Sequence, residues 1–251
     1  MKFEKFLDMT APMVAMAFAA GMTSGCNADV SINDQKGMPL SELDLTGKAP
    51  DKLVLMGNDN VRITAGDTLK IELEGSEDDK AKMRFVLDDE TLGVLRDKWS
   101  SDGNTVTVHV TMPAPREILV GGSGSVHTNA LAREAELSIG GSGSVEAPSI
   151  AADSLEVSIA GSGDVHAAGT VRDLEISLAG SGDADMPGLK ADKVKVSIAG
   201  SGSATFSSDG EVHANIIGSG DVNVRGNARC TIKSVGAGTL TCERGVAAEA
   251  D

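Results

Sequence analysis

The sequence predicts an all-β protein built as a parallel β-helix, a solenoid in which successive coils of chain stack on one another. Three observations predict this class. A glycine-serine-glycine motif returns at a nearly constant spacing, apolar residues recur at fixed positions around each copy, and no segment beyond the N-terminus shows a helical period. The chain has 251 residues, of which 41% are hydrophobic, so it can build a sizeable core.

The motif stands seven times in the second half of the chain, the last time as GAG. Its copies begin at Gly122, Gly141, Gly161, Gly180, Gly200, Gly218 and Gly236. Successive copies lie 19, 20, 19, 20, 18 and 18 residues apart. A fixed period of this length is typical of a solenoid, and it predicts about seven coils of 18–20 residues.

Apolar residues hold three positions around each motif. Four residues before it stand Ile118, Leu137, Val157, Ile176, Val196, Ala214 and Ile232. Two before it stand Val120, Ile139, Ile159, Leu178, Ile198, Ile216 and, as the exception, Ser234; four after its first glycine stand Val126, Val145, Val165, Ala184, Ala204, Val222 and Leu240. Each copy is therefore expected to be a strand, a corner and a second strand with one face inward. Stacking in register about 4.8 Å apart would bury that face.

The corners themselves suggest two kinds of chemistry. Their fourth position alternates between Asp164, Asp183 and Asp221 in some copies and Ser125, Ser144, Ser203 and Thr239 in others. Glycine-aspartate repeats that bind calcium have half this period, so we expect these side chains to cap the corner and no metal to bind. A phosphate-binding loop would need a following helix and usually a lysine, and neither is present.

The N-terminal segment carries the signals of export. Residues 10–22 form an apolar stretch of the length of a signal-peptide core, too short to span a bilayer. Ser24, Gly25 and Cys26 resemble the end of a bacterial lipobox, in which Cys26 would be lipidated. Ordinary cleavage near Cys26 and Ala28 is the alternative. Residues 1–26 are thus expected to be a signal peptide, and residues 27–50, polar with Gly and Pro, a linker.

The rest of the chain is expected to form one domain over residues 51–246, followed by a tail at 247–251. Around Gly57, the residues Leu53, Leu55 and Val61 match the three apolar positions, which predicts an eighth, earlier coil. Residues 75–105 would then be an insertion or an N-terminal β cap.

These residues resemble a known family. Strands such as LEVSIAGSGDV at a period near 19, preceded by KLVLMGNDNVRITAGD, are similar to the head GIN domain family, which is described as a "putative auto-transporter adhesin". The resemblance covers residues 50–245. It implies a right-handed parallel β-helix in an exported bacterial protein, often a lipoprotein, and it carries over no catalytic residues.

A row of glutamates is the first candidate site. Five residues before the corners stand Glu117, Glu136, Glu156 and Glu175, followed by Lys195, His213 and Thr231. If the coils are in register, neighbouring carboxylates would repel by about 1 kcal/mol each in water. A solvated face explains this row, and a shallow cation or partner site is the alternative. Ser138, Ser158, Ser177 and Ser197 form a polar row beside it.

Two cysteines stand symmetrically about the last corner. Cys230 and Cys242 lie six residues before and six after Gly236, both at inward positions. An exported protein meets an oxidising compartment, so we expect a disulfide that closes the terminal coil, with two packed thiols as the alternative.

Composition and charge narrow the function. The formal net charge of −15 argues against nucleic acid and anionic membranes as partners, leaving a lipid anchor as the membrane contact. The outward positions show no acidic and basic cluster of the kind that β-helix lyases use, and the four histidines are scattered in the sequence, so we predict no enzyme and no cofactor. The sequence favours a non-catalytic adhesion or interaction protein of the periplasm, outer membrane or cell surface, whose partner is an envelope protein or glycan. A β-helix that binds or cleaves polysaccharide is the alternative.

Overall fold

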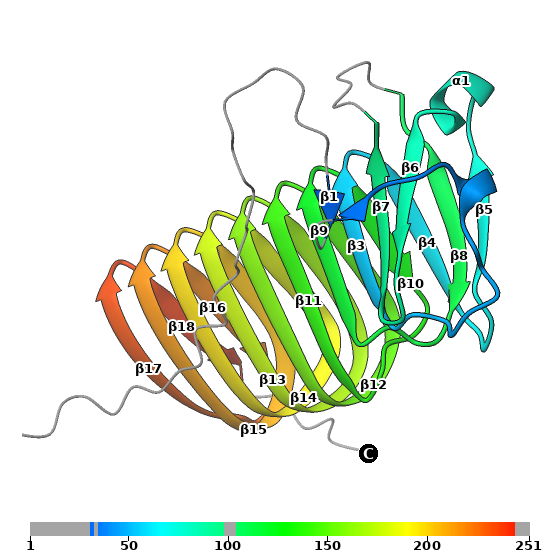
Figure 1. The fold of residues 1–251 in the computed structure, drawn as a ribbon. Helices are drawn as coiled ribbons and strands as arrows, with labels where there is room; N and C mark the ends of the chain where they lie inside the picture. Colours follow the sequence, from blue (N-terminus) through cyan, green and yellow to red (C-terminus); the bar gives the residue numbers. More distant parts are fainter. Residues whose placement is uncertain (1–30, 33–34, 98–103, 244–251) are drawn as a thin grey trace, which may run out of the picture.

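The computed structural model describes residues 31–32, 35–97 and 104–243. It is a parallel β-solenoid of about seven coils, as the repeat predicts, with the coils stacked along one axis (Figure 1). A single short α-helix and one 3₁₀ turn are the only helical elements in these ranges. No helix in the described part of the chain is long and apolar enough to cross a membrane.

Two walls of parallel strands, here called wall A and wall B, form the solenoid. Wall A contains, in spatial order, β17 (Arg229–Gly236), β15 (Ser203–Gly218), β14 (Asp183–Gly200), β13 (Asp164–Gly180), β12 (Ser144–Gly161), β11 (Glu134–Gly141), β9 (Glu117–Gly122), β3 (Lys52–Gly57), β7 (Thr91–Arg96) and β6 (Met83–Leu87). Wall B contains β18 (Thr239–Glu243), β16 (Asp221–Arg225), the first parts of β15 to β12, then β10 (Ser125–Thr128), β4 (Asn60–Ala65), β8 (Thr107–Met112) and β5 (Lys70–Glu74). The long strands β12 to β15 bend and serve both walls.

The apolar positions stack in register and form the core. Ile118 pairs with Leu137 in the next coil and with Leu53 in the previous one, and all three side chains are buried. Leu55 pairs with Val120 and Val61 pairs with Val126 in the same way, so residues 52–65 form the earlier coil that the sequence predicts. The core is made chiefly of Val, Ile, Leu and Ala, and it also contains the buried side chains of Phe85 and Phe206.

The corner glycines are required by the close approach of successive coils. Gly180 has φ +129°, and a Cβ atom built there would lie 2.3 Å from the carbonyl oxygen of Gly161 in the neighbouring coil. Gly182, two residues on, meets the oxygen of Gly163 at 2.4 Å in the same way. Any side chain would clash with backbone in both places, which is why the motif keeps two glycines.

Residues 66–97 and 104–112 form the cap at the N-terminal end. Strand β5 pairs antiparallel with β8, and β6 pairs antiparallel with β7, so both walls end in an antiparallel strand. The short helix α1 (Glu77–Lys80) connects them (Figure 1). Of residues 75–105, expected as an insertion or an N-terminal β cap, the described residues 75–97 and 104–105 belong to this cap.

The segment expected as a linker, residues 27–50, packs against this cap where the structure describes it. It contains β1 (Ser31–Ile32), β2 (Gln35–Lys36) and η1 (Leu40–Glu42). The backbone of Met38 exchanges hydrogen bonds with that of Phe85 in β6. Apolar residues cause the difference, because Ile32 is buried against the cap and Leu40, Leu43 and Leu45 pack on the core. Polar residues surround these few apolar residues in the sequence, so the stretch as a whole indicated a linker.

Candidate functional site

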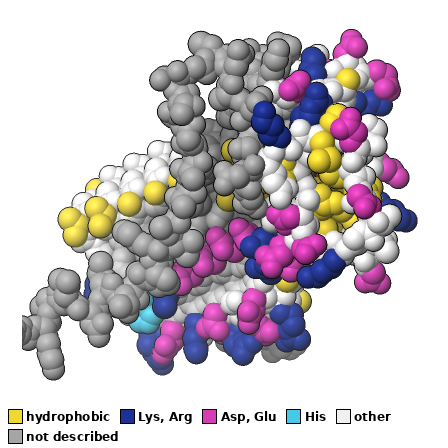
Figure 2. All heavy atoms as spheres, viewed as in Figure 1, with side chains coloured by type: hydrophobic (Ala, Val, Ile, Leu, Met, Phe, Trp, Pro, Cys, Tyr) yellow, Lys and Arg dark blue, Asp and Glu magenta, His cyan; other side chains and the backbone are white. Residues whose placement is uncertain are grey.

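The glutamates of wall A stand in one row across adjacent coils. Glu136 pairs with Glu117 on one side and with Glu156 on the other, and Glu156 pairs with Glu175. The row continues into Lys195 and His213. Figure 2 shows the acidic side chains following one another along the solenoid. The sequence period predicts this row correctly, because each coil contributes one residue to it.

A second row runs beside the first, and the sequence analysis did not single it out. Its members, in register, are Glu134, Ser154, Asp173, Lys193, Glu211 and Arg229. Side chains of both rows, together with Arg116, line a shallow groove of about 740 Å³. One half of this groove carries carboxylates, and the other half carries Lys193, Lys195 and His213 among its lining residues. Each member of this row stands seven residues before the first glycine of its corner, two positions before the glutamate row. Counting back from the corners would therefore have revealed it.

The carboxylates of the groove differ in their partners. Lys52 Nζ lies 3.4 Å from Glu117 Oε2, and Ser138 Oγ donates a hydrogen bond of 3.0 Å to Glu136 Oε1. Within the described residues, no ion pair or side-chain hydrogen bond reaches Glu156 or Glu175. Elsewhere on the surface, opposite charges of adjacent coils form ion pairs. Arg133 and Arg172, for example, both pair with Asp153.

The environment of Glu156 disfavours its charged form. Burial raises the pKa of this carboxyl, and the charges of Glu136 and Glu175 on either side raise it further. A positive charge placed between these side chains would offset both effects. The groove is therefore suited to a cationic group, although nothing in its geometry supplies a nucleophile with an adjacent base.

The described residues contain no group of three or more His, Cys, Asp or Glu side chains arranged to hold a metal ion. The glutamates stand one per coil in a line, whereas a bound metal ion requires ligands that converge on one point. The residues that line the groove come from several adjacent coils.

The corner side chains bond between coils. Asp183 Oδ1 accepts hydrogen bonds from the backbone N–H of Ser203 at 2.7 Å and from its hydroxyl at 2.6 Å. Thr239 Oγ1 likewise donates to Asp221 one coil away, and Ser125 Oγ donates to Asn60. These side chains therefore tie three pairs of adjacent corners together.

Cys230 and Cys242 are joined in a disulfide across the last coil, with a Cα–Cα separation of 6.7 Å. Cys230 is in register with Val212 and Cys242 with Val224, both fully buried in the preceding coil. The disulfide thus replaces an apolar contact between the walls with a covalent bond. Cys26, the expected lipidation site, lies outside the described residues.

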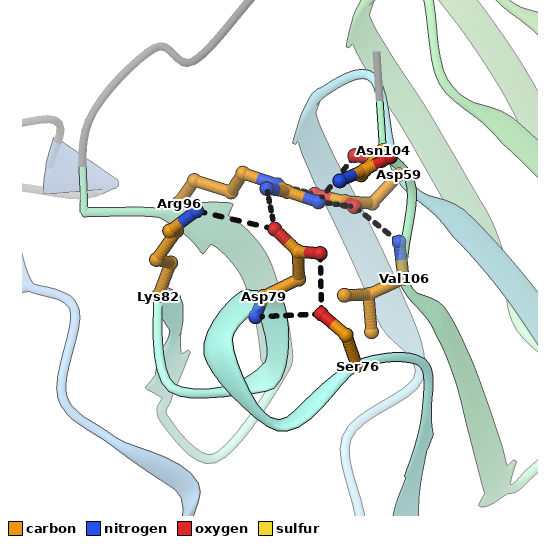
Figure 3. Close-up of polar contacts among 7 residues, drawn as sticks. All are labelled: Asp59, Ser76, Asp79, Lys82, Arg96, Asn104 and Val106. Carbon is orange, nitrogen blue, oxygen red and sulfur yellow. Dashed lines mark hydrogen bonds and ion pairs between the residues drawn. The ribbon is translucent and has the colours of Figure 1, made fainter. Parts of the chain in front are cut away.

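A buried ionic cluster at the N-terminal end was missed by the sequence analysis (Figure 3). Arg96 donates to Asp59 through Nε and Nη2, both at 2.7 Å, and its Nη1 lies 3.6 Å from Asp79. Asp59 Oδ1 also accepts from the N–H of Val106 at 2.8 Å. Asp59 is 0% exposed and Arg96 5% exposed. Asp59 occupies the corner of the earlier coil, so the cluster fastens the cap to the solenoid.

The remaining partners of this cluster come from the cap itself. Asp79 accepts from the hydroxyl of Ser76 at 2.5 Å and from Lys82 Nζ at 3.2 Å, and these two bonds lower its pKa. The backbone oxygen of Asn104 accepts from Arg96. Every charge in Figure 3 therefore has an opposite charge or a donor beside it, which indicates a structural role rather than a reactive one.

The histidines are less scattered than the sequence analysis predicts. His109, Arg62, His127, Glu146 and His166 form one row on wall B, in that order. His127 Nδ1 lies 3.1 Å from Glu146 Oε2, and His109 Nε2 lies 2.9 Å from Glu74 Oε2. His127, Glu146 and His166 share one position of the repeat, five residues after the first glycine of the corner. The extension through Arg62 to His109 was missed because β8 pairs with β4 through the cap, which no periodic spacing reveals. His213 alone lies on wall A.

Comparison with known proteins agrees with this architecture. The family model "Putative auto-transporter adhesin, head GIN domain" matches residues 49–228, and the chain belongs to this family. None of the curated proteins matches it.

Several solved structures share the fold. A putative adhesin from Bacteroides fragilis is 22% identical with a TM-score of 0.69, over 78% of this chain and 94% of that one. A putative lipid binding protein from Parabacteroides distasonis is 20% identical with a TM-score of 0.65, over 79% and 94%. A putative adhesin from Parabacteroides merdae is 19% identical with a TM-score of 0.62, over 78% and 92%. At these identities the likeness establishes the fold.

Proposed function

We propose that this protein is a non-catalytic, adhesin-like protein of the bacterial cell envelope. It binds an elongated partner protein along the groove of wall A, with basic side chains of the partner over Glu136, Glu156 and Glu175. The observation that carries the proposal is the row of carboxylates in the groove, of which Glu156 and Glu175 have no ion pair within the described residues. The names of the family and of two similar structures, which call them adhesins, support the same class.

Export to the envelope is part of the proposal. It rests on the apolar segment at residues 10–22 and on Cys26 in a lipobox-like setting. Replacing Cys26 with Ala should move the protein from the membrane fraction to the soluble envelope fraction. Retention in the cytoplasm of both forms would contradict export.

The binding experiment uses residues 27–251, the chain left after removal of the expected signal peptide, as bait in an envelope extract of the source bacterium. The groove variant Glu136→Gln/Glu156→Gln/Glu175→Gln should lose a protein that the wild type retains. The matched control, Asp67→Asn/Glu72→Gln/Asp78→Asn, changes the net charge equally at exposed positions of the cap and should retain it.

Two outcomes would overturn the proposal. Capture that is unchanged in the groove variant would place the partner elsewhere. Capture of a glycan in place of a protein would favour the polysaccharide-binding alternative, and shortening of that glycan would make the protein an enzyme.

A further inference from the structure

The last coil ends in two strands that are paired on one side only. Strand β17 pairs with β15, and β18 pairs with β16, and no other strand of the described residues continues either wall. Figure 1 shows this coil at the free end of the stack. The backbone N–H and C=O groups along its outer edge are therefore available to another strand.

Apolar side chains accompany this open edge. Ile232 is 41% exposed, whereas Ala214, its counterpart one coil inward, is 2% exposed. Val235 is 72% exposed and Ile217, one coil inward, is 64% exposed. Ile232 therefore leaves the core seam of wall A uncovered at its end, and Val235 adds an exposed apolar residue on the outward face of the same strand. Exposed apolar residues on a strand edge are a feature that proteins usually avoid.

The opposite end of the solenoid is closed. Its last strands, β5 and β6, are antiparallel to their neighbours, Met38 bonds to the outer edge of β6, and charged residues such as Glu72 and Glu74 stand on β5. Because one end is blocked and the other is open, head-to-tail growth is disfavoured. Association through the open edge must join two equal ends about a two-fold axis.

We propose that a second copy of this chain covers the open edge, with β17 of each copy pairing antiparallel to the other around Ile232. This register keeps inward residues opposite inward residues, so that Ile232 lies opposite the partner's Ile232. It sets Thr231 opposite the partner's Lys233 and Arg229 opposite the partner's Val235. The two core seams then join into one.

The terminal coil carries little net charge, whereas the chain as a whole is strongly acidic. The chain carries a net charge of −15, yet residues 219–243 contain Arg225, Arg229 and Lys233 against Asp221 and Glu243. The terminal coil is thus the part of an acidic molecule where two copies approach with little repulsion.

The test is sedimentation equilibrium of residues 27–251 between about 1 and 100 µM. The wild type should show a monomer–dimer equilibrium. Val235→Lys places a positive charge opposite Arg229 of the other copy, twice in the dimer, and should weaken the dimer about tenfold. Val235→Glu should tighten it by a similar factor, since the opposing residue is the same arginine. The charge swap Arg229→Glu/Val235→Lys should restore dimerisation.

Ile217→Lys and Ile217→Glu are the matched controls, because Ile217 is similarly exposed in the same outward row but lies one coil away from the edge. Both should dimerise as the wild type does. A wild type that stays monomeric at 100 µM would overturn the proposal. Equal effects of Lys and Glu at position 235, or a larger effect at position 217, would also overturn it. Dimerisation only after truncation behind Glu243 would show that the chain's own tail covers the edge, which again overturns it.

Discussion

The two ends of the solenoid face the same problem and solve it differently. A terminal coil has a neighbour on one side only, so its core residues lack the contacts that a further coil would make. At the N-terminal end an antiparallel cap covers the coil, and the buried cluster of Asp59, Arg96 and Asp79 fastens it. At the C-terminal end the disulfide between Cys230 and Cys242 ties the walls together, while Ile232 stays exposed.

The ionic cluster and the disulfide stabilise different parts of the molecule. An ionic cluster shared by cap and solenoid couples two segments that are far apart in the sequence, and its loss should destabilise both. A disulfide that closes a short loop constrains only the chain within that loop, here residues 230–242. The N-terminal end should therefore unfold together with the body of the protein, and the C-terminal end should open locally.

Arg96→Met should have the largest effect. It leaves the fully buried Asp59 without its bidentate partner, and breaking such a buried pair costs about 3–5 kcal/mol of the free energy of unfolding. Urea denaturation, followed by circular dichroism, measures the loss. The double variant Asp59→Asn/Arg96→Met removes both charges and should recover part of it. An equal loss in the single and double variants would show that packing, and not the charge, holds the cap.

Removal of the disulfide should have a smaller and local effect. Cys230→Ala/Cys242→Ala frees a short loop, for which the chain-entropy model gives about 3 kcal/mol. Hydrogen exchange should speed up for residues 229–243 and stay unchanged for residues 52–65 in the earlier coil. Faster exchange in both regions would show that the terminal coil supports the whole solenoid, and no change in either would show that the disulfide is not needed.

Glu156→Gln should have the smallest effect, and it should be stabilising. Like charges opposite one another in adjacent strands cost about 0.2–1 kcal/mol. Because the folded pKa of Glu156 lies above the ordinary value of 4.5, the charged form is penalised above that raised pKa. The penalty is relieved as the pH falls through it toward 4.5.

The variant should thus be more stable than the wild type at pH 7 by a few tenths of a kcal/mol. The two should become equal near pH 4. Urea midpoints across this range measure the difference. A variant that is less stable at pH 7 would mean that the carboxylate has a partner that stabilises it.

The periodic part of the molecule could be predicted from its sequence, and the rest could not. In the repeat, each coil places the same residue types at the same depth, so the core columns, the glutamate row and the positions of Cys230 and Cys242 follow from counting. The Asp59–Arg96 pair could not be counted, because its members lie 37 residues apart and belong to different elements. An aspartate where the other corners carry glycine was the available signal.

The cap also changes spatial order. Strand β3 lies between β7 and β9, so residues that follow it in the sequence precede it in the stack. The place of His109 in the histidine row on wall B depends on the pairing of β8 with β4, and no local pattern contains it.

The most direct test of the binding groove is the affinity of residues 27–251 for a hexalysine peptide, measured by isothermal titration calorimetry at about 0.15 M salt. The wild type and the cap control Asp67→Asn/Glu72→Gln/Asp78→Asn should bind alike. The groove variant Glu136→Gln/Glu156→Gln/Glu175→Gln should bind at least tenfold more weakly. Equal affinities for all three would mean that net charge, and not the groove, attracts the peptide, and would contradict the account.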